Sequence, residues 1–168
     1  MVLEIFTLSG TNFRLRRAVE SDVGPIIELM NNDPIRAAEN SAAPQDRAAY
    51  IAAFRAIDAD SAQQLVVVAD DAENVVATMQ LTLIPGLARL GATRLLVEAV
   101  RVDEKLRGNG LGSAMMTWAV EEGRRRGAAL VQLTSDNARQ DAHRFYERLG
   151  FTASHVGFKL FLERGPRR

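Results

Sequence analysis

The sequence predicts an α/β protein with a mixed β-sheet flanked by about four helices. Two observations predict this class. In the middle of the chain, apolar segments 64–69 and 75–84 are joined by a short polar turn, as in an antiparallel hairpin. Further along, strand-like segments alternate with helical patterns, an order that favours parallel pairing. The length of 168 residues matches one domain, so we expect a single domain over 1–168.

The predicted elements follow one another without a repeat or a linker. A strand at 12–18 is indicated by alternating apolar and basic side chains. Ser21 and Asp22 then precede a helical pattern, as capping residues do. Pro44 begins a second helical stretch, because proline is tolerated in a first turn. The later elements are strands at 64–69, 75–84 and 94–102, a helix at 110–126, a strand at 129–134, a helix at 141–149 and a last strand at 156–162.

Composition excludes several kinds of chemistry. The chain has no cysteine, which removes disulfides, thiolate metal sites and cysteine nucleophiles. Its 21 basic and 21 acidic residues balance, which argues against a broad basic face for nucleic acid. His143 and His155, the two histidines, lie in no metal or triad motif, so no metal is expected. Without a secretory signal or an apolar run of about 20 residues, we expect a cytoplasmic protein that binds no membrane.

The segment 107–112, Arg-Gly-Asn-Gly-Leu-Gly, follows an apolar strand and begins a helix. Gly108, Gly110 and Gly112 allow the backbone to approach a ligand without obstruction by a Cβ. The first amides of a helix are unpaired donors, and the helix dipole adds about half a positive charge. Arg107 adds a full positive charge. This combination predicts a pyrophosphate-binding loop.

Three alternative loop types fit these glycines less well. A plain helix entry needs one glycine, whereas three are present with an arginine. A dinucleotide-binding pattern that started at Gly108 would need a glycine where Ser113 stands. A Walker A loop would need a Gly-Lys-Ser/Thr sequence, which does not follow.

Two motifs resemble one protein family. Arg107-x-x-Gly110-x-Gly112 resembles the acyl-CoA pyrophosphate loop of the GNAT N-acetyltransferases. The segment 141–151 is similar to the second signature of that family, an Ala-x-x-x-Tyr-x-x-x-Gly-Phe helix. The resemblance is strong over 95–151 and weak over 12–32. It implies the GNAT acyl-CoA N-acyltransferase fold, acetyl-CoA as cosubstrate and transfer of an acetyl group to an amine.

The resemblance also implies where acetyl-CoA binds. The pantetheine arm would lie between the strand that ends at Val102 and the strand at 129–134, where splayed parallel strands leave amides unpaired. One of these amides would stabilise the developing oxyanion. Asn137 would be a further contact, although the asparagine of the family often falls at the position of Arg139. The cofactor contacts implied are Val100, Arg101, Val102, Arg107, Gly108, Asn109, Gly110, Leu111, Gly112, Ser113 and Asn137.

Two residues are catalytic candidates. Glu98 interrupts an apolar strand, and similar family members carry an acidic residue there as the general base, acting directly or through water. The alternative is a glutamate that is exposed at an edge or salt-bridged. Tyr146 matches the tyrosine that donates to the departing thiolate; a phenol is a weaker acid than a thiol, so a hydrogen bond is favoured over full proton transfer. The alternative is a core tyrosine.

Arg101 and the two histidines have no assigned role. Arg101 could pair with Glu98, line the acceptor pocket or point to solvent, while surface positions are expected for His143 and His155.

Two functions are compatible with these residues. The first is an N-acetyltransferase in which a small-molecule amine or a peptide amine attacks acetyl-CoA directly in a ternary complex, because no cysteine exists to carry an acyl group. The start of the 141–151 segment also resembles aminoalkylphosphonate-type acetyltransferases. The second is an inactive acetyl-CoA sensor or interaction module. The acceptor pocket is expected from 28–60 and 84–93, and a homodimer is compatible with the family.

Overall fold

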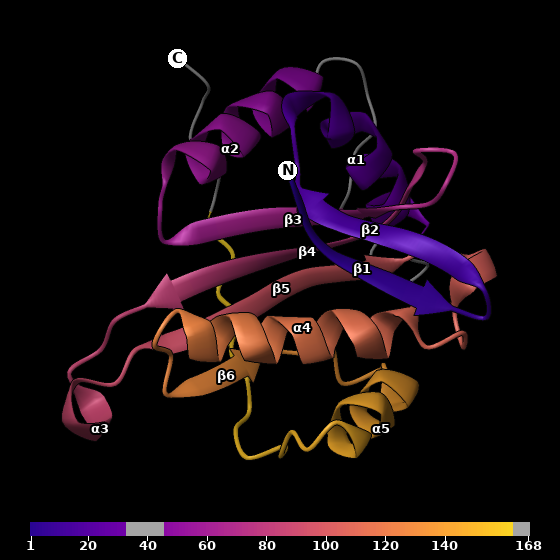
Figure 1. The fold of residues 1–168 in the computed structure, drawn as a ribbon. Coiled ribbons are helices and arrows are strands. Elements are labelled where there is room, and N and C mark those ends of the chain that lie inside the picture. Colours follow the sequence, from indigo (N-terminus) through magenta and orange to yellow (C-terminus); the bar gives the residue numbers. More distant parts are fainter. Residues whose placement is uncertain (33–45, 163–168) are drawn as a thin grey trace. The chain divides into compact units, whose positions relative to one another are not determined.

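The computed structural model describes residues 1–32 and 46–162 (Figure 1). Contacts along the chain define two compact units, Met1–Leu133 and Thr134–Arg168. The single domain expected over 1–168 therefore stays a prediction.

The first unit contains a six-stranded sheet with the order β1-β2-β3-β4-β5-β6. Neighbouring strands are antiparallel except β5 and β6, which are parallel. The predicted α/β class with a mixed sheet is thus confirmed. The strands are β1 (Val2–Leu8), β2 (Thr11–Arg17), β3 (Gln63–Ala69), β4 (Val75–Ile84), β5 (Arg94–Val102) and β6 (Leu130–Leu133).

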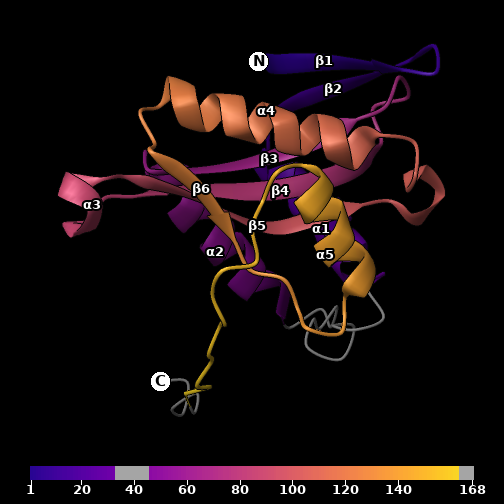
Figure 2. The same cartoon turned by 90° about the horizontal axis from the view of Figure 1, so that it is seen from below.

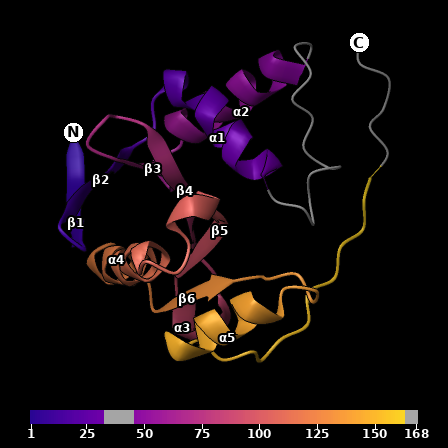
Figure 3. The same ribbon diagram turned by 90° about the vertical axis from the view of Figure 1, so that its right-hand side faces the viewer.

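Helices cover both faces of this sheet. Figures 2 and 3 show α1 and α2 on one face and α4 on the other. The four predicted helices are all present, and a short helix, α3, is added between β4 and β5. The helices are α1 (Val23–Asn31), α2 (Arg47–Ala59), α3 (Ala88–Gly91), α4 (Leu111–Arg125) and, in the second unit, α5 (Gln140–Arg148), with 3₁₀ turns η1 (Glu20–Asp22) and η3 (Glu104–Leu106).

The face under α1 and α2 is an apolar core. Val23 and Ile26 of α1 and Phe54 of α2 are buried against Val67 of β3. Their spacing places them on one side of each helix, which is why the helical pattern could be recognised in the sequence.

The opposite face packs closely under α4. A Cβ added to Gly123 would lie 3.1 Å from Cδ2 of Leu95 and 3.4 Å from Cγ2 of Val131. Glycine at this position therefore lets α4 approach β5 and β6. Residues 103–110, which include η3, connect the end of β5 to the start of α4.

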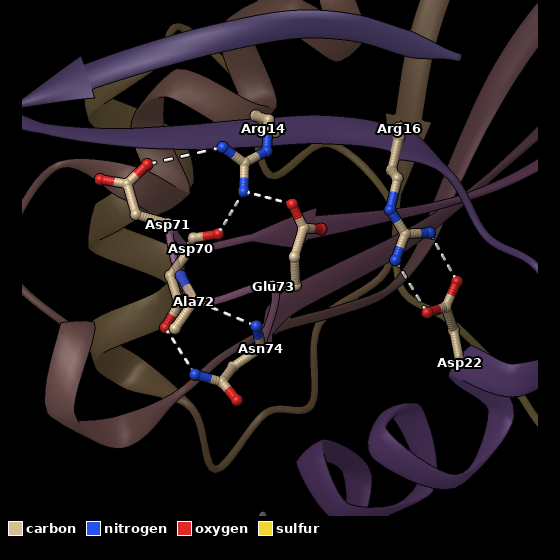
Figure 4. Close-up of polar contacts among 8 residues, drawn as sticks. All are labelled: Arg14, Arg16, Asp22, Asp70, Asp71, Ala72, Glu73 and Asn74. Atoms are coloured by element: carbon tan, nitrogen blue, oxygen red, sulfur yellow. Dashed lines mark hydrogen bonds and ion pairs between the residues drawn. The ribbon is translucent and has the colours of Figure 1, made fainter.

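The carboxylate of Asp70 anchors the turn between β3 and β4 (Figure 4). Asp70 accepts the backbone N–H of Ala72 at 3.0 Å and that of Asn74 at 2.8 Å, which closes the turn between β3 and β4. Burial raises the pKa of Asp70, but these hydrogen bonds and that of the Asn74 side chain outweigh it and lower the pKa. Arg14 donates to the Asp70 carbonyl at 2.7 Å and holds the turn against β2.

The structure differs from the sequence prediction at both ends. β1 was not predicted, because Phe6 is its one buried residue and the alternation is weak. The predicted strand at 156–162 is wrong: the segment is not in a strand, and its large apolar side chains are exposed. An apolar pattern makes a strand only where a neighbouring backbone completes its hydrogen bonds, and 134–162 contains α5 but no strand. Pro44 lies outside the described residues.

Candidate functional site

The parallel pairing of β5 with β6 is short. It runs from the pair Arg94–Leu130 to the pair Val97–Leu133 and ends there. Beyond Val97, β5 continues to Val102 beside β4 alone, within the described part of the sheet. The other edge of β5 is therefore open from residue 98 onward. This is the edge at which the sequence predicted a splayed pair of strands.

An irregularity bends β5 at the same place. Met79 of β4 lies opposite two residues of β5, Ala99 and Val100. This arrangement is a β-bulge, which bends a strand and redirects its side chains. Ala99 adopts a φ of 52°, a left-handed conformation that costs about 1 kcal/mol or more outside glycine. The strained bulge separates the part of β5 that pairs with β6 from the part with an open edge.

The main chain after the bulge presents polar groups to this open edge. The N–H of Asp103 donates to the carbonyl of Val76 at 2.8 Å and therefore points toward β4. Successive residues of a strand direct their backbone groups to opposite edges. The N–H and C=O groups of Val102 and Val100 accordingly point away from β4, toward the open edge.

Two arginines donate hydrogen bonds to carbonyl oxygens on this edge. Nη1 of Arg101 donates to the Val100 carbonyl at 2.8 Å, and Nε of Arg107 donates to the Val102 carbonyl at 3.3 Å. Arg101 is half-buried and its guanidinium lies along β5. The N–H groups of Val100 and Val102 are thus the main-chain groups best placed for an extended, amide-bearing ligand.

The start of α4 forms a second donor group. Gly110 precedes the helix with a φ of 87°, and Gly108 has a φ of 80°. No side chain caps this helix, and the first intrahelical bond runs from the N–H of Ala114 to the carbonyl of Gly110 at 3.0 Å. The amides of residues 111–113 therefore have no acceptor within the helix. Together with exposed Arg107, they form a donor set that fits a pyrophosphate.

Glu98 lies between the bulge and the β6-paired part of β5. The apolar neighbours suggested a buried strand, but the Glu98 side chain is exposed. The reason is alternation: Leu95 and Val97 are buried on the α4 face, so Glu98 points to the opposite face. Its carboxylate is hydrated rather than desolvated. Directly across the ladder from Glu98 is Gln80 of β4.

Sequence motifs gave no signal for Gln80. It is the middle residue of a polar row on β4 formed by Thr78, Gln80 and Thr82. The row lies on the face that carries Val67 and the core under α1 and α2, and Thr78 is fully buried there. Only the register opposite Glu98 marks Gln80 as a candidate.

The remaining candidates belong to the second unit. Tyr146 of α5 is half-buried and makes edge-to-face contacts with Phe145 and Phe151, with ring centroids 5.1 and 5.9 Å apart. Asn137 is exposed before α5, and its carbonyl accepts from the side chain of Gln140 at 2.9 Å. The ordered segment from Glu98 to Ser113 lies wholly in the first unit.

The two histidines differ from one another. The surface position expected for His143 is wrong: its ring is half-buried, and Nε2 lies 2.9 Å from the carbonyl of Asp136. His155 is exposed, with Nδ1 2.7 Å from Oγ of Ser154.

Metal clusters and membrane-spanning helices are both absent from the part of the chain that the structure describes. Among residues 1–32 and 46–162, no cluster of three or more His, Asp or Glu side chains is arranged to hold a metal ion. No helix in the same ranges has the length and apolar character to cross a membrane.

The mixed sheet with helices on both faces is the fold of the GNAT acetyltransferases. A family model described as the Acetyltransferase (GNAT) family matches residues 27–151. The chain belongs to this family, as the two sequence motifs predicted.

Similar proteins include enzymes and one regulator. An aminoalkylphosphonate N-acetyltransferase of Salmonella typhimurium is 47% identical over 62 residues, which cover 37% of this chain and 40% of that protein. An uncharacterized N-acetyltransferase of Methanocaldococcus jannaschii is 35% identical over 60 residues, covering 36% of this chain and 26% of that protein. The matches thus span less than half of either curated relative.

Among solved structures, a transcriptional regulator from Bacillus halodurans superposes with a TM-score of 0.85 at 35% identity, over 89% of this chain and 99% of that chain. An acetyltransferase from Trypanosoma brucei superposes with a TM-score of 0.71 at 28% identity, over 89% and 99%.

Proposed function

We propose that this protein is an acetyl-CoA-dependent N-acetyltransferase that acetylates a primary amine of a small molecule or peptide by direct attack in a ternary complex. One observation carries the proposal. The uncapped start of α4 is connected through residues 103–110, which include Arg107, to the strand that carries Glu98 and an open edge. An anion-binding group and a carboxylate are thereby joined by one short, ordered segment.

The chain has the groups needed to hold acetyl-CoA, which supplies the acetyl thioester. The amides of 111–113 and the guanidinium of Arg107 would bind the pyrophosphate. The N–H groups of Val100 and Val102 would pair with amides of the pantetheine arm, and one of them would donate to the thioester oxygen as negative charge develops there. Asn137 is proposed as a further contact.

Glu98 is proposed as the general base. An amine must lose a proton before or during attack, and a carboxylate on the open edge can take it directly or through one water. Because Glu98 is exposed, it can return that proton to solvent after each turnover. Tyr146 is proposed to donate a hydrogen bond to the departing thiolate.

The similarity to the Salmonella enzyme supports a small acceptor with a phosphonate group. We therefore propose aminoalkylphosphonates as the first acceptor class to test, ahead of amines without an anionic group.

A second function has one observation in its favour. The Bacillus halodurans chain that superposes at TM-score 0.85 is described as a transcriptional regulator. A protein that binds acetyl-CoA without turnover would serve such a role.

The proposed function is tested with calorimetry followed by a thiol-release assay. Acetyl-CoA and CoA are titrated first, and the saturated protein is then mixed with aminoalkylphosphonates, simple alkylamines and short peptides. Micromolar binding with CoA release for one class supports the transferase. Binding without release for any amine supports the sensor, and absence of binding overturns both.

A further inference from the structure

Three polar side chains form a hydrogen-bonded relay that ends opposite Glu98. Nε2 of Gln63 donates to Oδ2 of Asp60 at 3.3 Å, and Nε2 of Gln80 donates to Oε1 of Gln63 at 2.7 Å. Gln80 is in register with Glu98 across the β4–β5 ladder. The relay therefore runs from the end of α2 across β3 and β4 toward the catalytic candidate.

The relay fixes which way each amide points. A carboxylate only accepts hydrogen bonds, so the atom of Gln63 that meets Asp60 must be its NH₂ group. The carbonyl oxygen of Gln63 is then the atom that meets Gln80, and Gln80 must donate to it. Asp60 is itself held, because its Oδ1 accepts the backbone N–H of Ala62 at 2.8 Å.

The carbonyl oxygen of the Gln80 side chain is able to accept a hydrogen bond from another donor. Within the described residues, no hydrogen bond uses Oε1 of Gln80. Gln63 lies on the β3 side of Gln80, whereas Glu98 lies on the β5 side. Opposed residues of antiparallel strands have Cβ atoms about 5 Å apart, so Glu98 and Gln80 present two neighbouring acceptors.

We propose that Gln80 is a specificity residue: its oxygen accepts one N–H of the acceptor amine while Glu98 binds the other, which selects primary over secondary amines. This inference rests on the proposed N-acetyltransferase function. A neutral primary amine offers two N–H groups and a lone pair. A secondary amine offers one N–H, so one acceptor would be left unpaired.

The reaction remains balanced in this arrangement. The lone pair of the amine forms the new C–N bond as the C–S bond of the thioester breaks, and CoA departs as a thiolate. Glu98 takes one proton from the nitrogen, while the N–H bound to Gln80 becomes the N–H of the amide product. Gln63 and Asp60 act as positioning residues, because they set the orientation of Gln80 without touching the amine.

The first test compares amines that differ in one methyl group. Thiol release is measured at saturating acetyl-CoA with 2-aminoethylphosphonate, 2-phenylethylamine and the N-methyl derivative of each. The variants are Gln80→Leu, Gln63→Leu and the matched control Thr82→Val, which removes a hydroxyl from the same face of β4 opposite Leu96. Acetyl-CoA affinity, measured by calorimetry, reports whether each variant is folded.

Gln80→Leu is expected to raise KM for the primary amine about tenfold and to lower the primary-to-secondary ratio of kcat/KM by a similar factor. Gln63→Leu should act in the same direction but less, and Thr82→Val should behave as wild type. If the wild-type protein is active and the primary-to-secondary ratio of kcat/KM is unchanged in Gln80→Leu, this inference is overturned while the proposed function stands. Equal effects of Gln80→Leu and Thr82→Val also overturn it.

A second test needs no turnover. The side-chain amide signals of Gln80 are assigned as those that disappear from the NMR spectrum of Gln80→Leu. They are then followed during titration with methylammonium chloride or tetramethylammonium chloride at matched ionic strength. The inference expects a shift with methylammonium only. No shift, or equal shifts with both salts, overturns it. If wild-type protein acetylates neither primary amine, the proposed acceptors are wrong, and the NMR result decides the inference separately.

Discussion

Arg16 and Asp22 form a bidentate ion pair, with Nη1–Oδ2 and Nη2–Oδ1 distances of 2.7 and 2.9 Å (Figure 4). Oδ2 of Asp22 also accepts the backbone N–H of Val19 at 2.7 Å. The pair joins β2 to the start of α1, and Asp22 is buried while Arg16 is partly exposed. Burial raises the pKa of Asp22, but the hydrogen bonds from Arg16 and Val19 and the charge of Arg16 outweigh it and lower the pKa.

Replacement of Asp22 by asparagine should destabilise the fold. The change keeps the size of the side chain but leaves Arg16 without its counter-charge, so we expect a loss of about 2 kcal/mol in the free energy of unfolding. Urea unfolding followed by circular dichroism measures it. The control is Glu20→Gln, two residues earlier, whose pair with Arg55 is exposed and should contribute little. Equal losses in the two variants would contradict the expected role of burial.

Stability should fall at acidic pH, and Asp22 should account for part of the fall. Because the pKa of Asp22 is lower in the folded than in the unfolded chain, the unfolded chain binds more protons between the two values. Its contribution is complete above about pH 4, the ordinary pKa of aspartate, and is lost as pH falls through the lowered value. Asp70 adds in the same direction. Urea midpoints between about pH 5.5 and 2.5 should decline less steeply in Asp22→Asn than in wild type.

The sequence predicted the parts of this protein that local rules determine. The loop at 107–112 was recognisable because glycines and a helix entry leave a sequence pattern, and Gly110 does adopt a left-handed conformation. The bulge at Ala99 was not predictable, since alanine carries no preference for a positive φ. Glu98 could be named as a candidate from the sequence, but its exposure depends on which face of β5 meets α4. The relay through Gln63 and Gln80 depends on register between strands, which single-segment patterns do not contain.

Arg107→Ala should weaken CoA binding more than it slows chemistry. The guanidinium is directed to the end of β5 by its contact with the Val102 carbonyl, beside the free amides of α4. Loss of one charge-assisted contact to a phosphate should raise the Kd for CoA about tenfold, measured by calorimetry. Lys105→Ala, in the preceding turn, is the matched control and should have a smaller effect. An unchanged Kd in Arg107→Ala would remove the proposed pyrophosphate site.

Glu98→Gln should lower kcat while leaving CoA affinity unchanged. Glutamine keeps the shape and one acceptor atom but cannot take a proton, so we expect a loss of about 100-fold or more at neutral pH. Stopped-time thiol release at saturating acetyl-CoA measures kcat, and calorimetry measures binding. Full activity in this variant would exclude Glu98 as the base.

Tyr146→Phe separates a hydrogen-bonding role from a packing role. Phenylalanine keeps the edge-to-face contacts with Phe145 and Phe151 and removes only the hydroxyl. If the hydroxyl stabilises the departing thiolate, kcat should fall about tenfold to 100-fold with thermal stability nearly unchanged. Tyr146→Leu, which also removes the ring, should lower both activity and stability. Affinities for acetyl-CoA and CoA are measured for each variant alongside the assay. A loss confined to kcat in Tyr146→Phe identifies the leaving-group step. A wild-type kcat in Tyr146→Phe assigns Tyr146 to packing alone.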